Sequence, residues 1–545
     1  MIDPIGSFDE VKENLVLYIK TAFATRYQSI EEEREKLLMG ENVMCRDPWL
    51  EPLPRYLSSR KKVADIQTTD LPTLRPQELE RFKSLATCGL FSSTRTLYYH
   101  QLEMLQKVLS GKNCIITAGT GSGKTEAFLL PLFAYLAKES VSWAAPNSPE
   151  PHADDWWKNV AHQQSCRARA QSYRIKQRKH EKREAAVRAI ILYPMNALVE
   201  DQLIRLRKSL DSDEARKWFK DKAKGNRIYF GRYYSNTPIP GHERHEPDSH
   251  GAQKWNYIKV SKLAKELERI EGDAKGAEKE SDEIRSDDTE LADIIKYSFP
   301  RLDGSEMRSR WDMQDHPPDI LITNFSMLSI MLMRDEDSQI FTKTKEWLED
   351  GPDRVFHLIV DELHMYRGTA GTEVAHLIRL LLSRLGLKPE DGRLRIMGSS
   401  ASLLKGKAES ETFIKDFFGI AAEDFDIIGG ELEPLNTTGS PDTLPANPFI
   451  KLSQIAENVN DDDLDDIARM LGYQGSPKGK IALEECLTSS QINIDYQIYR
   501  ACNSIDQIRA ASLDEFGERL FGASIDKNER RQAVRGFLIA RGLYQ

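Results

Sequence analysis

One segment of the sequence has the residue types and spacing of a phosphate-binding loop. It runs from Ala118 to Thr125 as AGTGSGKT, directly after the apolar run CIIT and directly before EAFLLPLFAYLA, which has helical character. Glycines let such a loop turn tightly and point backbone N–H groups at phosphate oxygens, and the start of a helix adds partial positive charge. We therefore expect Lys124 to reach the β- and γ-phosphates of ATP or GTP, and Thr125 to hold Mg²⁺. The strict pattern has glycine at the position of Ala118.

A pair of carboxylates follows a second apolar run. Asp361 and Glu362 come directly after LIV (358–360) and precede Leu363 and His364. In a parallel sheet the carboxyl end of this strand can lie beside the phosphate loop, where Asp361 would bind Mg²⁺ and Glu362 would orient or activate the attacking water. His364 is placed to sense the γ-phosphate. An acidic pair after an apolar run is common by chance, so this interpretation depends on the upstream loop.

The apolar runs that must position these groups are short and alternate with helical stretches. They are CIIT (114–117), AIILY (189–193), RIYF (227–230), DILIT (319–323), LIV (358–360) and LRIM (394–397). Buried strands that alternate with helices are typical of a parallel, doubly wound sheet. The sequence therefore predicts an α/β fold whose functional loops lie at the carboxyl ends of the strands.

AGTGSGKT and DELH together resemble motifs I and II of the DEAH-type superfamily 2 helicases, whose phosphate loops begin with alanine. Gln101 lies 23 residues before Lys124, a spacing similar to that of the family's adenine-reading glutamine. The other motifs follow in order as PMNAL (194–198) with Gln202, SNTP (235–238), TN (323–324) with ML (327–328), and SAS (400–402), where the family has Ser-Ala-Thr. The resemblance covers about residues 95 to 405 and implies a P-loop RecA-like sheet.

This resemblance implies a role for each matching residue. ATP contacts would come from Gln101, Thr120, Gly121, Ser122, Gly123, Lys124 and Thr125, with Mg²⁺ held by Thr125 and Asp361. Catalysis would depend on Lys124, Asp361, Glu362 and His364, while Ser400 and Ser402 would couple the ATP site to the nucleic acid. Nucleic-acid contacts, mostly to phosphates and therefore independent of base sequence, would come from Pro194, Asn196, Gln202, Thr237, Thr323 and Asn324.

The longer string DELHMYRGTAGTEVAHLIRLL narrows the resemblance. It is similar to the subgroup that includes the bacterial mitomycin-repair helicase, its fungal RecQ-like relatives and helicase subunits of phage-defence systems. This subgroup implies DNA as the nucleic acid and movement from 3′ to 5′, and it suggests a role in phage defence. Arg367 marks the subgroup, and its side chain could have a specific role or only an ion pair where the next helix begins.

The rest of the chain is organised around this region. We expect an N-terminal helical unit at 1–75, a RecA-like ATP-binding domain at 76–440 and a helical C-terminal segment at 441–545. The RecA-like domain would carry helical insertions at about 139–186 and 241–300, because both stretches interrupt the alternation of strands and helices.

Three patterns outside the motifs each have two interpretations. Eight basic residues and one acidic residue lie between Arg167 and Arg183, which fits a solvated helix face more often than a phosphate-binding surface. Trp156 and Trp157 more often anchor an insertion than stack on a base. DDDLDD at 461–466 is typical of a helix start rather than of a metal-binding loop.

Composition excludes several classes of protein. With 545 residues, 40% hydrophobic and 30% charged, the chain is globular and long enough for several units. A net charge of −9 means that any nucleic-acid surface must be local. The six cysteines are far apart without a C-x-x-C pair, which predicts reduced thiols, and no 18 apolar residues run together. We therefore expect a cytoplasmic protein without a membrane segment.

The second half of a superfamily 2 motor is missing from the sequence pattern. Residues 406–545 contain no Q-x-x-G-R-x-G-R-like string, the motif that supplies arginine fingers to the ATP site. One interpretation is an ATP-dependent helicase or translocase lobe that needs a second RecA-like lobe from a missing segment or a partner subunit. The other is an ATP-gated nucleic-acid-binding scaffold without independent hydrolysis. In either case we expect ATP binding with poor hydrolysis, because an arginine finger contributes about 10³ to 10⁵ in rate.

Overall fold

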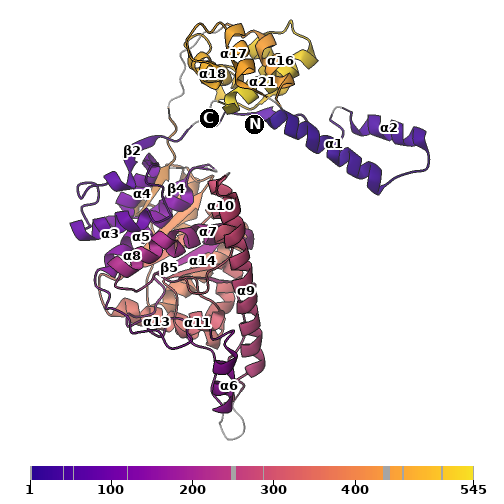
Figure 1. The fold of residues 1–545 in the computed structure, drawn as a ribbon. Coiled ribbons are helices and arrows are strands. Elements are labelled where there is room, and N and C mark those ends of the chain that lie inside the picture. The colour runs from indigo at the N-terminus through magenta and orange to yellow at the C-terminus, as the bar shows by residue number, and fades with distance from the viewer. Residues whose placement is uncertain are drawn as a thin grey trace. The chain divides into compact units, whose positions relative to one another are not determined.

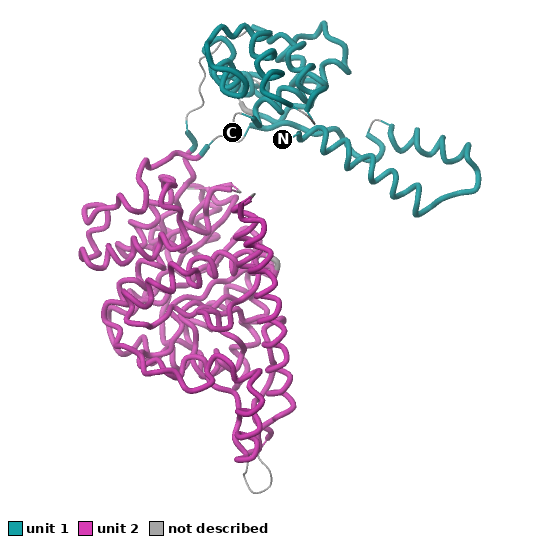
Figure 2. The backbone as a smooth tube through the Cα atoms, in the orientation of Figure 1, with its two compact units in different colours: residues 1–55, 432–545 teal, residues 56–431 magenta. Residues whose placement is uncertain are grey.

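The computed structural model describes residues 3–40, 42–52, 55–119, 121–246, 253–286, 288–404, 406–433, 442–456, 459–504 and 507–543. The chain forms two compact units, drawn in teal and magenta in Figure 2. Unit 1 combines residues 1–55 with 432–545, and unit 2 comprises 56–431. The two terminal segments, which we expected as separate helical units, therefore form one unit, and residues 56–75 belong to unit 2.

A seven-stranded parallel sheet forms the framework of unit 2 (Figure 1). In spatial order its strands are β10 (Phe425–Gly429), β4 (Asn113–Thr117), β9 (Leu394–Ser400), β8 (Phe356–Val360), β5 (Ala189–Tyr193), β7 (Ile320–Asn324) and β6 (Phe230–Tyr233). Because β4, β9 and β8 are neighbours in parallel register, the loops that follow them open at the same edge. The predicted RecA-like α/β fold is confirmed.

Helices cover both faces of the sheet, with a separate hydrophobic core on each face. The first core includes α3 (Pro76–Ala86), α4 (Tyr99–Leu109), α5 (Lys124–Ser140), α7 (Asn196–Asp211) and α8 (Asp213–Lys222). The second includes α11 (Arg310–Asp315), α12 (Phe325–Met333), α13 (Ser338–Glu349), α14 (Gly368–Arg384) and α15 (Ala408–Phe418). Side chains alternate along each strand, so Ile359 lies in the first core while Leu358 and Val360 lie in the second.

Two strands differ from the prediction. β6 begins at Phe230 rather than at residue 227. The preceding Tyr229 is buried, but its N–H donates to the side chain of Asp319 at 2.7 Å instead of to a neighbouring strand. β10 was not predicted; its short apolar run pairs with β4 and ends the sheet on that side. A short antiparallel pair, β2 (Ser58–Lys62) and β3 (Thr96–Tyr98), lies in the same unit.

The two insertions form a small core of their own. It contains residues around α6 (Val160–Ala168) and along the long helix α9 (Tyr257–Ile284), beside which α10 (Thr289–Ser298) packs (Figure 1). Trp156 and Trp157 are buried in this core, which confirms their interpretation as anchors. The helix α9 lies within the helical insertion expected at about 241–300, and one side of it is buried against this core.

Three arginine side chains of the basic run from Arg167 to Arg183 are buried, whereas Arg167, Arg169, Lys179 and Lys182 are exposed. The side chains of Arg174, Arg178 and Arg183 are at most 4% exposed. Arg183 binds both carboxylate oxygens of Asp319 at 2.7 and 2.6 Å. Asp319 lies far away in sequence, while Glu181, within the run, pairs with both Arg178 and Arg183, so the charges compensate one another inside the fold. Both earlier interpretations of the run were wrong for these three arginines.

Unit 1 is mostly helical. It contains α1 (Pro4–Ala22), α2 (Gln28–Leu38), α16 (Ala446–Gln454), α17 (Asp461–Met470), α18 (Gly479–Thr488), α19 (Ile494–Cys502), α20 (Leu513–Phe521) and α21 (Lys527–Leu543). Two small antiparallel pairs complete it: β1 (Trp49–Leu50) with β13 (Ala511–Ser512), and β11 (Asn503–Ser504) with β12 (Gln507–Ile508). The acidic run is the first turn of α17, with Asn460 as its N-cap, which confirms the predicted helix start.

Ion pairs join α1 to α21 within unit 1. Arg531 approaches Asp9 to 2.6 Å, and Arg535 approaches Asp3 to 2.6 Å. Elements from the two ends of the chain therefore depend on each other. No helix in the described parts of either unit is long and apolar enough to cross a membrane.

Candidate nucleotide-binding site

The phosphate loop has the backbone conformation that its glycines predict. Gly121 and Gly123 have φ angles of +74° and +71°, in the left-handed region that favours glycine. A Cβ atom at Gly121 would meet no heavy atom within 4 Å, whereas one at Gly123 would lie 2.3 Å from Nε2 of Gln101. The loop is thus open at Gly121 and closely supported at Gly123. Thr120 lies outside the described residues.

Side chains from the preceding elements hold the loop from behind. Gln101 accepts the N–H of Tyr98 and donates to the carbonyl of Gly123, each at 3.0 Å, so both ends of its amide are engaged within the protein. His100 bonds the carbonyl of Ser122 at 2.8 Å. These bonds fix the loop in place. They also mean that Gln101, expected to read adenine, would have to exchange a partner to bind a base.

Tyr56 reaches the opposite end of the loop. Its hydroxyl accepts the N–H of Gly119 at 2.9 Å, and its ring lies edge-on to His100 with centroids 5.3 Å apart. Tyr56 was not predicted, because it lies far upstream of the loop and outside any motif. It occupies one of the backbone donors that a phosphate loop offers.

The two motifs meet through an ion pair. Nζ of Lys124 lies 3.2 Å from Oε1 of Glu362, although the residues are 238 positions apart in sequence. Oε2 of Glu362 lies 3.1 Å from Nδ1 of His364, which forms an ion pair when the imidazole is protonated. The described residues give these two atoms no other polar partner. Lys124, Glu362 and His364 are therefore brought together at one edge of the sheet.

Asp361 is the buried member of the acidic pair. Its side chain accepts a hydrogen bond from the hydroxyl of Ser399, and its Oδ1 also accepts the N–H of Glu362 at 3.1 Å. Burial raises the pKa of Asp361; the Ser399 hydrogen bond opposes this, while the carboxylate of Glu362 adds to it. A bound cation would favour the ionised form. The environment is thus better suited to a carboxylate with a positive neighbour than to one without.

Two buried tyrosine hydroxyls without hydrogen-bond partners accompany Asp361. Tyr193 and Tyr366 are 0% and 3% exposed, and neither hydroxyl has a partner among the described residues. Burial, and then the charge of Asp361, raises the pKa of both phenols, which places both near that carboxylate. Buried polar atoms without partners often mark a place for an ion or water.

Residues 98–228 match the family profile described as DEAD/DEAH box helicase. This part of the chain carries the sequence of a DEAD/DEAH box helicase domain. The match confirms the resemblance that AGTGSGKT indicated, whereas DELH, at 361–364, lies outside the matched residues.

Relatives of the helicase domain are larger than this chain. Druantia protein DruE of Escherichia coli is 32% identical over 456 residues, which cover 78% of this chain and 22% of the relative. The ATP-dependent RNA helicase mss116, mitochondrial, of Aspergillus fumigatus is 33% identical over 96 residues, 15% of each chain. A crystal structure of the DUF1998 helicase MrfA superposes with a TM-score of 0.34 at 17% identity, covering 76% of this chain and 45% of that one. The chain therefore spans less than half of each relative.

In the helicase domain, Ser399 rather than Ser400 or Ser402 contacts the acidic pair. Its hydroxyl bonds Asp361 and accepts the N–H of Glu362 at 3.1 Å. Ser400 accepts the N–H of Ser402 at 3.2 Å and so shapes the loop. Alternation along β9 explains the difference, because Ser399 and Ser400 point to opposite faces. The expected coupling pair therefore lies one residue beyond the direct contact.

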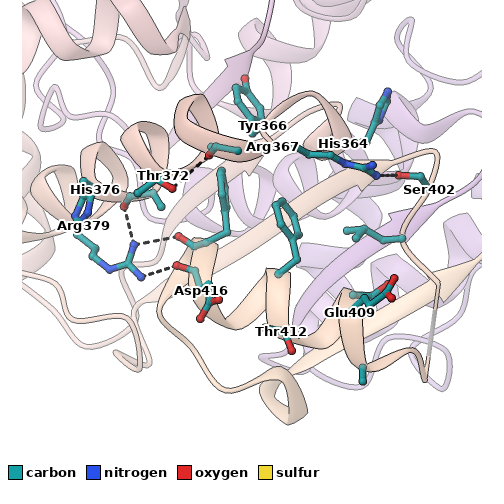
Figure 3. Close-up of a pocket in the computed structure, with 18 residues that line it drawn as sticks. His364, Tyr366, Arg367, Thr372, His376, Arg379, Ser402, Glu409, Thr412 and Asp416 are labelled. Carbon is teal, nitrogen blue, oxygen red and sulfur yellow. Dashed lines mark hydrogen bonds between the residues drawn. The ribbon is translucent and has the colours of Figure 1, made fainter.

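Arg367 links the segment after DELH to the end of β9. Its Nη2 donates to the hydroxyl of Ser402 at 2.7 Å, as Figure 3 shows. Both residues line a cavity of about 1080 Å³ between α14 and α15. Of the two interpretations of Arg367, the ion pair is not present among the described residues, where the side chain donates to a neutral hydroxyl.

The residues expected to contact nucleic acid separate into two groups. Asn196 and Asn324 meet at the edge of the sheet, where Nδ2 of Asn324 donates to Oδ1 of Asn196 at 2.7 Å; Pro194 precedes them, half-buried. Thr237 and Thr323 are buried, and their hydroxyls donate to the backbone carbonyls of Arg232 and Tyr233. These threonines shape turns and do not present a hydroxyl to a ligand. Gln202 contacts Thr125 instead.

Proposed function

We propose that this chain supplies the ATP-binding lobe of a DNA helicase or translocase and that turnover requires a second RecA-like lobe. The observation that carries the proposal is the approach of Lys124 to Glu362, because it joins the phosphate loop to the acidic motif at one point. A Gly-rich turn without a nucleotide role would not need a lysine and a carboxylate from a distant strand at its mouth. The match to DEAD/DEAH box helicases supports the same conclusion.

The residues fit magnesium and ATP. Open space at Gly121 leaves room for a phosphate, and the start of α5 presents backbone donors without a side-chain cap. Lys124 would hold the β- and γ-phosphates, Thr125 and Asp361 would hold Mg²⁺, and Glu362 would orient the attacking water beside His364. When bound, the cation supplies positive charge that stabilises the phosphates. Ser399 keeps Asp361 in place for this contact.

Asn196, which is exposed, and Asn324, which is half-buried, would meet the nucleic acid at the carboxyl ends of β5 and β7. Amide groups suit phosphate and sugar contacts, so we expect binding that does not depend on base sequence. DNA rather than RNA, and a role in phage defence, rest on the DELHMYRG string and its subgroup resemblance.

A second lobe is part of the proposal because the described residues contain one seven-stranded sheet and otherwise only two-stranded pairs. No arginine-finger string is present in residues 406–545. The absent arginines also favour a second candidate function, an ATP-gated nucleic-acid-binding scaffold. Glu362 favours the first, since a scaffold does not need a residue that orients water.

The two candidates are separated by nucleotide binding and turnover measured on the same protein. We expect the chain to bind MgATP, to lose binding in Lys124→Ala, and to hydrolyse ATP slowly whether or not single-stranded DNA is added. A longer chain that includes a second RecA-like lobe should show DNA-stimulated hydrolysis, and Glu362→Gln should abolish it. Nucleotide-dependent DNA binding without turnover in the longer chain would favour the scaffold. No nucleotide binding by folded protein would refute both, and rapid multiple turnover by this chain alone would refute the need for a second lobe.

A further inference from the structure

Gln202 of α7 contacts the residue proposed to hold magnesium. Its Nε2 donates to Oγ1 of Thr125 at 3.2 Å, across 77 positions of sequence. The other end of the same amide, Oε1, is buried and has no hydrogen-bond partner among the described residues. A buried acceptor without a partner is energetically unfavourable, because it has lost its hydrogen bonds to water. The present arrangement therefore satisfies only half of the Gln202 amide.

The same helix begins at the nucleic-acid loops. Asn196 is the first residue of α7 and bonds Asn324, the last residue of β7. Asn324 also caps α12 by accepting the N–H of Met327 at 2.8 Å. Gln202 lies six residues after Asn196, a distance of about 9 Å along a helix. One rigid element thus joins Thr125 to the loops where nucleic acid is expected.

A second contact fastens this part of α7 beside the phosphate loop. Arg205 forms an ion pair with Glu126, which lies in the first turn of α5, one residue after Thr125. Glu126 is buried, and its partner approaches from α7. A shift of α7 would therefore move the start of α5, and a change in the position of Thr125 would move α7.

Magnesium would change what Thr125 offers to Gln202. A threonine hydroxyl has one donor hydrogen and two acceptor lone pairs. When Oγ1 binds a divalent cation, the charge makes the hydroxyl a stronger donor and a poorer acceptor. The Nε2 of Gln202 then loses its best partner, while the unpartnered Oε1 could accept the Thr125 hydrogen. Rotation of the amide would bring Oε1 to Thr125 as the acceptor of this hydrogen.

We propose that Gln202 is a positioning residue that senses the magnesium–nucleotide complex at Thr125 and transmits its binding through α7 to Asn196 and Asn324. Without nucleotide the amide donates to Thr125; with the complex bound it accepts from Thr125. The inference rests on the proposed nucleotide site and adds the path by which that site controls nucleic-acid affinity. The resemblance implied that Gln202 contacts the nucleic acid. In this proposal Gln202 instead connects the nucleotide site to the residues that contact the nucleic acid.

The experiment measures thermodynamic coupling in the full chain. Calorimetry gives the affinity for magnesium and a non-hydrolysable ATP analogue, and fluorescence anisotropy gives the affinity for a single-stranded oligothymidine with and without that complex. The coupling factor is the ratio of the two oligonucleotide affinities, and such factors are typically about 5 to 150. The variants are Gln202→Leu, which can neither donate nor accept, and Gln202→Glu, which can only accept.

The two variants have different expected results. Gln202→Leu should bring the coupling factor close to one, because the amide that distinguishes the two states of Thr125 is gone. Gln202→Glu imitates the accepting state, so its nucleotide-free form should bind the oligonucleotide as the nucleotide-loaded wild type does. Asp201→Asn, on the exposed side of the same helix, is the matched control and should couple like the wild type. If Gln202 had only a structural role, Gln202→Leu would lower the affinity for the nucleotide and the affinity for the oligonucleotide. The coupling factor would stay unchanged.

The outcomes separate this inference from the proposed function. Wild-type coupling in Gln202→Leu would overturn the role of Gln202 while leaving the nucleotide site intact. Binding of both ligands by the wild type with no coupling would have the same meaning. Failure of folded wild type to bind the nucleotide would overturn both.

Discussion

Replacing Glu362 by glutamine should strengthen nucleotide binding while stopping hydrolysis. In the structure Lys124 is bonded to Glu362 at 3.2 Å, with side-chain exposures of 11% and 24%. The lysine must leave this partner to reach the phosphates. A partly exposed ion pair contributes about 1 kcal/mol, which corresponds to roughly a fivefold change in affinity. Glutamine keeps the shape of the side chain but removes the competing charge, so this amount becomes available for binding.

The measurement is calorimetric titration of magnesium and a non-hydrolysable ATP analogue at low salt. Glu362→Gln should bind about fivefold more tightly than wild type, and Lys124→Ala should lose binding. Glu423→Gln removes an exposed carboxylate elsewhere in unit 2 and should change nothing. Weaker binding by Glu362→Gln would show that Glu362 assists ground-state binding rather than competing for Lys124, and would refute the reasoning.

Three further predictions follow from buried polar contacts. Ser399→Ala should lower turnover of the two-lobe enzyme about tenfold in a steady-state ATPase assay, because Asp361 loses a hydrogen bond that contributes about 1.5 kcal/mol. Asp319→Ala should lower the free energy of unfolding by about 3–5 kcal/mol in urea titrations, because it removes the counter-charge of buried arginines. Burial alone would raise the pKa of Asp319, but those arginines lower the pKa overall. The ionised carboxylate therefore stabilises the folded protein at pH values above the ordinary carboxyl pKa, and this stabilisation is lost as pH falls towards the lowered pKa. Tyr193→Phe should change the free energy of unfolding by less than about 1 kcal/mol in thermal melts, since its hydroxyl has no partner among the described residues.

Each of these has a contrary result. Unchanged turnover in Ser399→Ala would mean that the backbone alone fixes Asp361. Asp319→Ala as stable as wild type would show that water compensates the arginines. A large loss of stability in Tyr193→Phe would reveal a partner for its hydroxyl in solution.

Contiguous motifs were predictable because their chemistry is local. The run from Ala118 to Thr125 contains its own glycines, lysine and hydroxyl, and the flanking apolar stretches determine the strand and helix around it. The acidic pair was predictable for the same reason, because it comes directly after the apolar run that forms its strand. Parallel alternation of strands and helices then determined the fold class, since few arrangements bury every strand on both faces.

Contacts between distant segments were not predictable from one sequence. Ser399 reaches Asp361 only because β9 lies beside β8 and presents that residue to the correct face. Tyr56 meets Gly119 through elements that share no motif with the loop. The burial of Thr237 depends on turn geometry, which its SNTP context does not reveal. Each case needs the position of a neighbour that is distant in sequence.

Charge patterns were misleading for a related physical reason. The run of basic residues contains only one acidic residue, Glu181, so most of its counter-charge is not visible when that segment alone is considered. Arg174 finds Asp312 and Glu243, and Arg183 finds Asp319, all more than 60 positions downstream. Burying a charge is tolerated when its partner is buried with it, so local composition could not show that these arginines are interior.

The pairing of α1 with α21 has a consequence for synthesis on the ribosome. Asp9 is translated more than 500 residues before its partner Arg531. At about 5–20 residues per second, the first helix waits roughly half a minute to two minutes for that partner. Unit 2, whose residues emerge in between, can fold during this interval. The exposed apolar side chains of α1, among them Leu17 and Tyr18, remain accessible to chaperones throughout the delay. Late synthesis of α21 therefore leaves α1 without these ion-pair partners during that interval.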